Sequence, residues 1–415
     1  MIRDTEGARS NRAVDTIALW PKVIAQIEAR YDWYALPRSA FAPEFAEDLL
    51  RRREAVTSPD PTDPTSPRPI KLVTALDQER QILRFASAIV LETGRDPKTI
   101  KSIADVVEPD AAKAALNFKL KRLRQRDKSA ETSMEIHVGA GLLVVLAKHY
   151  VKASPEDLEI LRGLARRLKP KNAQQMTKKN RELLRRFEDE KTIAKFIAAP
   201  SRVSAEILKR KQLRRVDSAR LQAALGAAIL MVAPVRSKNL GKIRFEHNLI
   251  RVGTGHNESF RLYFPADEVK NTVELEFELN GTVKELLQVY LDRARPLIAD
   301  PKSDYLFPGR GTNGIVPAHL SGSIARMMSK EIGIRIAAHQ FRHVAGHLFL
   351  AQNPGAYEIV RQFLGHKKLS TTVDFYAGME MRTAANLLDQ HISKRREDLA
   401  GKGPFGMRRR RGKRG

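Results

Sequence analysis

The sequence predicts a multidomain, mainly helical protein in which an all-α domain precedes a mainly α (α+β) domain with a small antiparallel sheet. Three observations lead to this prediction. Apolar residues recur at helical spacing from Thr74 to about residue 195, three strand-like runs lie together between 249 and 279, and a proline-rich stretch precedes both. The 415 residues are enough for two or three domains.

The proline-rich stretch predicts a linker. Residues 58–69 (SPDPTDPTSPRP) contain five prolines and cannot continue a helix. We therefore expect residues 1–70 to be an N-terminal extension ending in an extended linker. A helical pattern around Ile17–Ile27 lies within it, with Trp20 and Trp33 as candidate anchors. This extension indicates no activity by itself.

A helical domain follows over residues 71–195. Ile82, Phe85, Ile89 and neighbouring apolar residues follow the i, i+3, i+4, i+7 pattern, and Gly94 is placed as a C-cap. Pro200 and a polar stretch are expected to mark the end of this domain. Further helices are predicted at Ala111–Arg126, Met134–Ala153, Pro155–Leu168 and Lys178–Phe187.

The next domain is predicted over residues 200–395. Ser218–Val232 is apolar on nearly all sides, which is typical of a buried helix, and Pro234 stops it just before Arg236. Helices resume at Val283. The intervening strand-like runs, which predict the antiparallel sheet, are Leu249–Val252, Ser259–Phe264 and Thr272–Leu279.

The charge of the chain favours a polyanionic partner. Lys and Arg number 74 against 48 Asp and Glu, a net charge of +26. Basic residues cluster at 119–128, 162–186 and 402–415. Any one cluster is equally well explained as a solvated helix face, and basic proteins also bind anionic lipid. Three clusters in one chain favour nucleic acid, because neutralising phosphates releases counterions.

Several chemistries are excluded or disfavoured. The chain has no cysteine, so it has no disulfide, thiolate zinc site, iron–sulfur cluster or cysteine nucleophile. Acidic residues interrupt the first thirty positions and no apolar run reaches eighteen, so we expect neither a signal peptide nor a membrane span, and a cytoplasmic, nucleoid-associated protein. Gly309–Gly314 fits GxGxxG, but Pro308 and Pro317 flank it, which predicts a loop.

Three histidines recur at a spacing of four residues. His339, His343 and His347 would lie along one helical face and could in principle ligate a metal. HExxH does not occur, and Arg342 beside them would repel a cation. We therefore do not predict a metal site.

A second pattern near the C-terminus fits phosphate chemistry. On a helix, His339 and Arg342 share a face and can address one anion. His366 follows, and Tyr376 comes ten residues later (376 − 366), with Ser370–Thr372 as N-cap candidates for its helix. Cations would stabilise a tyrosine phenolate as a nucleophile. Taken singly, each residue is also explained as part of a core edge or a surface ion pair.

These motifs resemble the tyrosine recombinase, or phage-integrase, family of site-specific DNA recombinases. The resemblance rests on APVRSKNLGKIRF at 233–245, HQFRH at 339–343 and LGHKKLSTTVDFY at 364–376, in that order and spacing. It covers about Leu72 to Ser393. It implies that 71–195 is a helical core-binding domain and 200–395 a catalytic domain. Residues 1–70 and a basic C-terminal tail at 396–415 lie outside the resemblance.

The resemblance also implies roles for individual residues. Tyr376 would attack a scissile phosphodiester and form a 3′-phosphotyrosyl link, while Arg236 and Arg342 would clamp the phosphate. His339 and His366 would hydrogen-bond the phosphate and act as acid–base partners of Tyr376, and Lys270 would be the general acid for the 5′-oxygen. No metal or other cofactor is implied. Lys238 and Lys242 are rivals to Lys270, and Asn239 stands where the family commonly has a bracing Glu.

The expected partner is double-stranded DNA, bound by a homotetramer on two DNA sites, with a directionality factor as a further partner. Met381–Ser393 would be the helix exchanged between protomers. The implied function is DNA integration or excision, fitting a mobile element. Alternatives are a type IB-like topoisomerase, a non-catalytic DNA-binding relative and, more remotely, a metal-binding regulator built on the histidine series.

Overall fold

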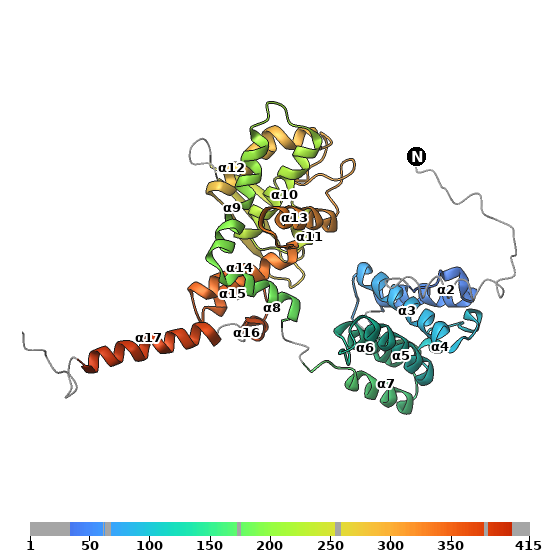
Figure 1. Ribbon diagram of the computed structural model, residues 1–415. Coiled ribbons are helices and arrows are strands. Elements are labelled where there is room, and N and C mark those ends of the chain that lie inside the picture. The colour runs from blue at the N-terminus through green and yellow to red at the C-terminus, as the bar shows by residue number, and fades with distance from the viewer. Residues whose placement is uncertain are drawn as a thin grey trace, which may run out of the picture. The chain divides into compact units, whose positions relative to one another are not determined.

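The computed structural model describes residues 34–60, 62, 68–171, 176–253, 259–376 and 381–400. The chain divides into two compact units, Met1–Ala173 and Gln174–Gly415, which are shown in Figure 1. Each unit has its own hydrophobic core. The prediction of a mainly helical chain with one small antiparallel sheet is confirmed.

The first unit is built from helices alone in its described residues. Its long helix α3 (Leu72–Thr93) buries Ile82, Phe85 and Ile89, as the apolar spacing predicts. It ends at Gly94, whose φ of 70° is left-handed, a conformation that glycine adopts without strain. The other α-helices are α2 (Pro43–Thr57), α4 (Ala104–Val107), α5 (Pro109–Arg126), α6 (Met134–Leu146) and α7 (Pro155–Arg167).

The part of the predicted extension that the structure describes belongs to this first core. Phe41, Phe45 and Leu49 are each 1% exposed and pack in the same cluster as Phe85. The expectation that the linker sets all of residues 1–70 apart is therefore wrong, because an apolar face of α2 needs α3 for burial. The helical pattern at Ile17–Ile27 and both tryptophans lie outside the described residues.

Helix α6 and the π-helical turn that continues it (Ala147–Val151) are long and apolar enough to cross a membrane. The segment Met134–Val151 has a mean hydropathy of 1.2, and it is the one such candidate among the described residues. Ile136, Ala140, Leu143 and Leu146 of this helix are buried in the first core. A single helix of this kind is weak evidence for a membrane span, and 39% of the segment is buried within the protein.

The second unit surrounds the buried helix α10 (Arg215–Val232), which the apolar run predicts. The chain leaves α10 through Pro234 and reaches Arg236, the N-cap residue of α11 (Ser237–Gly241). The remaining helices are α8 (Lys178–Arg185), α9 (Glu190–Leu208), α12 (Gly281–Val289), α13 (Pro317–Ile332), α14 (Ala338–Gln352), α15 (Tyr357–Leu364), α16 (Leu369–Tyr376) and α17 (Met381–Ala400).

The boundary between the units differs from the expected one. Residues 174–195 belong to the second unit, and Pro200 lies inside α9 rather than at a domain end. Pro200 is buried together with Phe196 and Val203 on the face of α9 that packs in the second core. Tertiary packing therefore maintains the helix across a residue that breaks an isolated one.

The sheet has the order β1-β2-β3 and is antiparallel throughout. Strands β1 (Leu249–Val252) and β2 (Ser259–Phe264) have the predicted bounds, and β2 alternates between buried and half-buried residues. Strand β3 (Leu275–Leu279) is shorter than predicted. Thr272 has a φ of 52°, so the chain is still turning there and cannot yet pair as a strand.

The glycine-rich segment Gly309–Gly314 is a loop, as predicted. An isolated antiparallel bridge joins Pro308 to Gly314 across it, and α13 begins only at Pro317. It does not open a helix, as a dinucleotide-binding turn would.

We predict that α2 is an integral part of the first unit. Phe45→Ala should lower the free energy of unfolding of this unit by roughly 3–5 kcal/mol, because it empties a fully buried site. Glu47→Ala, on the exposed face of the same helix, is the matched control. Urea denaturation of the full chain, followed by circular dichroism, measures both. Equal midpoints for the two variants would contradict the placement of α2.

Candidate active site

Arg342 lies at the centre of the candidate site. It projects from the first half of α14, and its side chain is buried, with 8% exposed. Its Nη1 donates to the carbonyl of Pro234 at 2.5 Å, and its Nη2 donates to the carbonyl of Leu364. These carbonyls lie two residues before Arg236 and two before His366. One guanidinium therefore joins the three segments that carry the predicted site.

Arg236 follows the Pro234 carbonyl that Arg342 binds, and one of its own N–H donors is unpaired in the described part of the chain. It is half-buried, and its Nη1 atom is buried with no hydrogen-bond partner among the described residues. Burial lowers its pKa. Burial also lowers the pKa of Arg342 to about 10, and the nearby charge of Arg236 lowers it further. Two close guanidinium groups with a free buried donor are suited to an anion that accepts several hydrogen bonds.

His366 is held in place by Thr372. It follows Gly365, whose φ of 58° ends α15, and its Nδ1 lies 2.9 Å from Thr372 Oγ1. Burial lowers the pKa of His366 to about 4, and the charges of Arg342, Arg236 and Arg361 add to this effect. The imidazole is therefore neutral at pH 7, with Nε2 on the ring edge opposite Thr372.

Thr372 was expected to be one of three N-cap candidates. Helix α16 instead begins at Leu369, so Ser370–Thr372 lie within its first turn. Thr372 is fully buried and contacts His366. The sequence showed a short hydroxyl residue at this position, but its role follows only from the fold that brings the two side chains together.

His339 and His343 occupy different environments on α14. His339 lies at the surface with its ring partly covered, and this partial burial and the charge of Lys179 on α8 lower its pKa. His343 is stacked on Phe375, with ring centroids 4.9 Å apart and planes 9° apart. Burial lowers the pKa of His343 to about 4. In the described residues, no group of three or more His, Asp or Glu side chains could hold a metal ion, His347 included.

Tyr376 is buried at the end of α16. Its side chain is 1% exposed, and its hydroxyl donates to the carbonyl of Arg342 at 3.2 Å. Gly346 allows this position, because a Cβ atom there would lie 2.5 Å from the hydroxyl oxygen. Burial raises the pKa of Tyr376 well above its usual range, and the charge of Arg342 opposes that rise. The hydroxyl is therefore not accessible to a ligand in this position.

Lys270 lies in the turn between β2 and β3, with its side chain exposed. Its neighbour Asn271 donates from Nδ2 to the carbonyl of Gly365 at 2.8 Å, which brings the turn onto the segment of His366. Lys238 and Lys242 are exposed on α11 and directly after it. Sequence reasoning missed Asn271, although it is the residue next to the predicted lysine.

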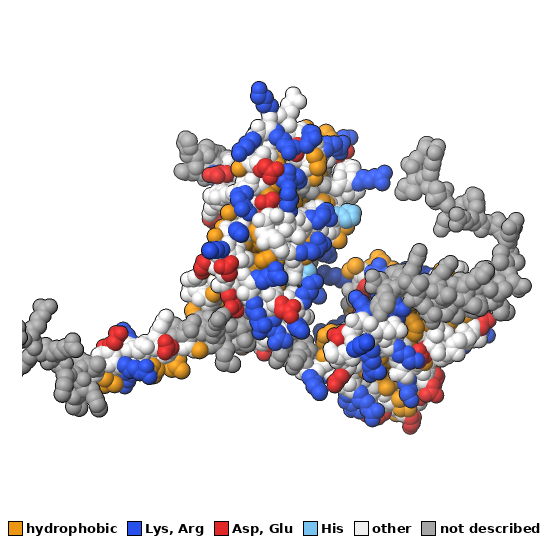
Figure 2. Space-filling view, viewed as in Figure 1, with side chains coloured by type: hydrophobic (Ala, Val, Ile, Leu, Met, Phe, Trp, Pro, Cys, Tyr) orange, Lys and Arg blue, Asp and Glu red, His pale blue; other side chains and the backbone are white. Residues whose placement is uncertain are grey.

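Cationic side chains lie beside the first turn of α14. Gln340 Nε2 donates to Asn180 Oδ1 of α8 at 3.3 Å, which brings α8 next to His339. Lys178, Lys179 and Arg181 of α8 are exposed. Figure 2 shows Lys and Arg side chains gathered over this face of the second unit. A polyanion bound at Arg236 and Arg342 would therefore meet further positive charge.

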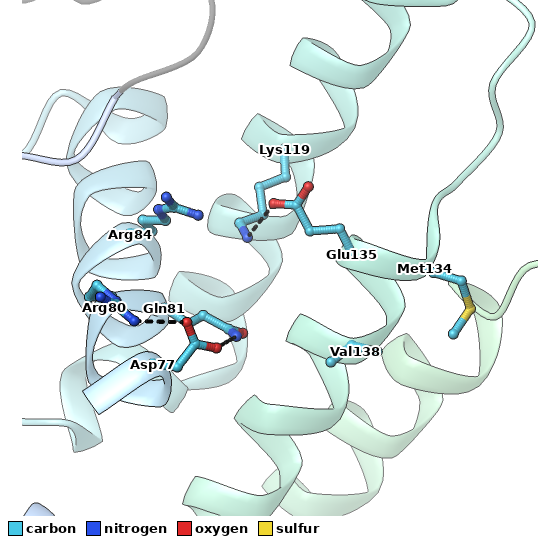
Figure 3. A pocket seen from close by; sticks show the side chains of 8 residues that line it. All are labelled: Asp77, Arg80, Gln81, Arg84, Lys119, Met134, Glu135 and Val138. Carbon is cyan, nitrogen blue, oxygen red and sulfur yellow. Dashed lines mark hydrogen bonds and ion pairs between the residues drawn. The ribbon is translucent and has the colours of Figure 1, made fainter. Parts of the chain in front are cut away.

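The first unit has a pocket lined by three cationic side chains and two carboxylates, which Figure 3 shows from close by. It has a volume of about 340 Å³ and lies between α3, α5 and α6. Asp77 holds Arg80 and Gln81 of α3 by hydrogen bonds. Lys119, at the start of the basic cluster 119–128, is only 8% exposed and lies 4.4 Å above the ring of Phe85. This member of the cluster thus packs in the unit rather than on an outer helix face.

Comparison with known proteins identifies the second unit. Residues 211–382 match the model of the phage integrase family, and all six predicted site residues lie within this segment. The chain therefore carries a domain of the phage integrase family, and the predicted resemblance to tyrosine recombinases is confirmed. No curated protein matches the chain.

Two solved structures resemble the chain at low identity. The XerH site-specific recombinase bound to its difH substrate, in a pre-cleavage complex, is 15% identical with a TM-score of 0.39, over 83% of this chain and 94% of that one. The XerA recombinase is 17% identical with a TM-score of 0.33, over 83% of this chain and 98% of that one.

We predict that Gly346 is what allows Tyr376 to stay buried. Gly346→Ala should displace the phenol, since the new methyl group would overlap its hydroxyl. Nitration by tetranitromethane, mapped by mass spectrometry, should spare Tyr376 in the wild type and modify it in the variant. Gly141→Ala, where an added Cβ meets nothing within 4 Å, is the control. Equal protection of Tyr376 in both variants would contradict this packing.

Proposed function

We propose that this protein is a site-specific DNA recombinase that cleaves and rejoins DNA strands through a 3′-phosphotyrosyl intermediate. The main support is the set of hydrogen bonds made by Arg342. They bring Arg236, His366 and Tyr376 close together within a domain of the phage integrase family. Double-stranded DNA is the proposed substrate, and the exposed cations of α8 support it.

The phosphate-binding step follows from the two arginines. In the described part of the chain, no ion pair joins Arg236 or Arg342 to a carboxylate, and the charge of Arg236 lowers the pKa of Arg342. A bound phosphodiester supplies the missing negative charge and accepts hydrogen bonds from the unpaired N–H groups. The same groups stabilise the extra charge of the pentacoordinate transition state without reorganising.

The proton transfers are assigned to His366 and Lys270. The Tyr376 oxygen attacks phosphorus, the bond from phosphorus to the 5′-oxygen breaks, and a phosphotyrosyl bond replaces it. Neutral His366 accepts the phenol proton, and its basicity rises once the phosphate neutralises the arginines that lower its pKa. Lys270 donates a proton to the 5′-oxygen. His339, at the exposed end of α14, hydrogen-bonds the phosphate.

Tyr376 must move for this reaction. In its buried position the hydroxyl is paired with a backbone carbonyl and covered by Gly346. Because burial raises its pKa, the phenol is protonated and unreactive there. The described conformation is therefore a resting state, and cleavage requires the end of α16 to release the side chain.

Further parts of the proposal rest on the family alone. We include a helical core-binding domain within the first unit, a homotetramer on two DNA sites with a directionality factor, and action without a metal. Helix α17 extends to Ala400, beyond the Met381–Ser393 segment expected to pass to a neighbour. Integration or excision of a mobile element in the cytoplasm is the proposed event. Of the predicted basic tail at 396–415, residues 396–400 belong to α17, and residues 401–415 lie outside the described residues.

We predict that Tyr376→Phe abolishes covalent attachment to DNA and leaves DNA affinity unchanged, because only the attacking oxygen is lost. Nicked suicide duplexes from the flanking genomic DNA, incubated with protein in EDTA, should give an adduct with the wild type only. Tyr357→Phe, at the start of α15, is the matched control. An adduct with Tyr376→Phe would contradict the assignment. Relaxation of supercoiled DNA by a monomer, without strand exchange, would favour the topoisomerase alternative.

A further inference from the structure

The turn that carries Lys270 is fastened on both sides of the lysine. On one side, Val269 is buried with 2% exposed; on the other, the Asn271 side chain reaches across to Gly365. Lys270 itself is exposed. A lysine side chain is long and flexible, so the place that its amino group can reach depends on how firmly the backbone beneath it is held.

The Asn271 contact links the turn directly to the segment of His366. The amide Nδ2 of Asn271 and the carbonyl oxygen of Gly365 are 2.8 Å apart, although the residues are 94 positions apart in the chain. Leu275, at the start of β3, packs on the same glycine, where an added Cβ would lie 2.9 Å from its Cδ2. Lys270 is thus the neighbour of the donor residue Asn271, and His366 is the neighbour of the acceptor residue Gly365.

A second link joins the turn to the segment of Arg236. Asn239, 7% exposed on α11, donates from Nδ2 to the main-chain carbonyl of Glu268 at 3.3 Å. The Glu268 carboxylate in turn lies 2.7 Å from His247 Nε2 and accepts from Asn248 Nδ2 at 2.9 Å. Asn239 stands where a brace for Arg236 was expected, but its amide holds the lysine turn instead.

We infer that Asn271 and Asn239 are positioning residues for Lys270. They hold the turn between the Arg236 and His366 segments, so that the lysine amino group reaches the 5′-oxygen of the scissile phosphate. This inference rests on the proposed function, in which the bond between phosphorus and the 5′-oxygen breaks and that oxygen takes a proton from Lys270. Neither asparagine touches the reacting atoms, so both act through the lysine.

The test compares two leaving groups. Suicide duplexes carry either the ordinary phosphodiester or a 5′-bridging phosphorothiolate, whose sulfur leaves without a proton. Lys270→Ala should slow cleavage of the ordinary substrate by roughly 100-fold or more, and Asn271→Ala by roughly 10- to 100-fold. The phosphorothiolate should restore both variants to near the wild-type rate. Asn239→Ala should show a smaller defect with the same rescue.

A double variant and a control complete the design. Lys270→Ala/Asn271→Ala should be no slower than Lys270→Ala alone, since the asparagine acts only through the lysine. Asn353→Ala removes an amide that donates to the carbonyl of Phe349 at 3.1 Å, elsewhere in the same unit, and should leave the rate unchanged. DNA affinity and thermal unfolding of each variant show whether it is folded. If Asn271→Ala is unfolded, Asn271→Ser and Asn239→Ala provide the same comparison.

The outcomes separate this inference from the proposed function. A defect of Asn271→Ala that persists on the phosphorothiolate, or a double variant slower than Lys270→Ala, would overturn the positioning role. A rate for Asn271→Ala equal to that of the wild type would do the same. Absence of any wild-type adduct at Tyr376 on either substrate would instead contradict the proposed function.

Discussion

The candidate site depends on the pair of hydrogen bonds from Arg342 to the carbonyls of Pro234 and Leu364. Buried carbonyl groups need a donor, and a buried guanidinium needs acceptors, so each satisfies the other. The bonds join segments 108 and 22 residues away in the chain. Because Arg236 and His366 each follow a bonded carbonyl by two residues, this one side chain fixes the backbone just before both of them.

This arrangement leaves positive charge unmatched at the site. Protein interiors usually pair a buried charge with an opposite one, whereas Arg236 has a buried donor without a partner. Leaving this donor unpaired costs folding free energy, and the proposed phosphate ligand would offset that cost on binding. Burial, together with the charges of Arg342 and Arg236, lowers the pKa of His366 to about 4 and keeps its ring neutral at pH 7. Burial raises the pKa of Tyr376, so in the proposed reaction phosphate binding and activation of the phenol would be separate events.

Local features were predicted well from the sequence. Helix α3 with its Gly94 cap, the buried α10 and strands β1 and β2 follow from spacing and turn residues alone. Pro200 was misjudged because its helix is maintained by packing that no local pattern encodes. The prediction that residues 1–70 stand apart failed for a similar reason, because only the folded unit shows that α2 completes the first core.

The sequence predicts which candidate residues share a helix, but not the contacts between separate elements. The spacing of His339 and Arg342 on one helix was readable, since a helix fixes which residues share a face. The contacts of Thr372 with His366 and of Asn271 with Gly365 were not, because they depend on how separate elements pack. The burial of Tyr376 against Gly346 depends on the same packing.

The most direct test of the central claim is hydrogen–deuterium exchange of Arg342→Lys compared with the wild type. Lysine keeps the positive charge but lacks the fork that bridges two carbonyls. In the variant, amide exchange should rise together in residues 233–241 and 364–376. Adduct formation should be lost while DNA still binds. Unchanged exchange in both segments, with adduct formation retained, would contradict the claim that Arg342 assembles the site.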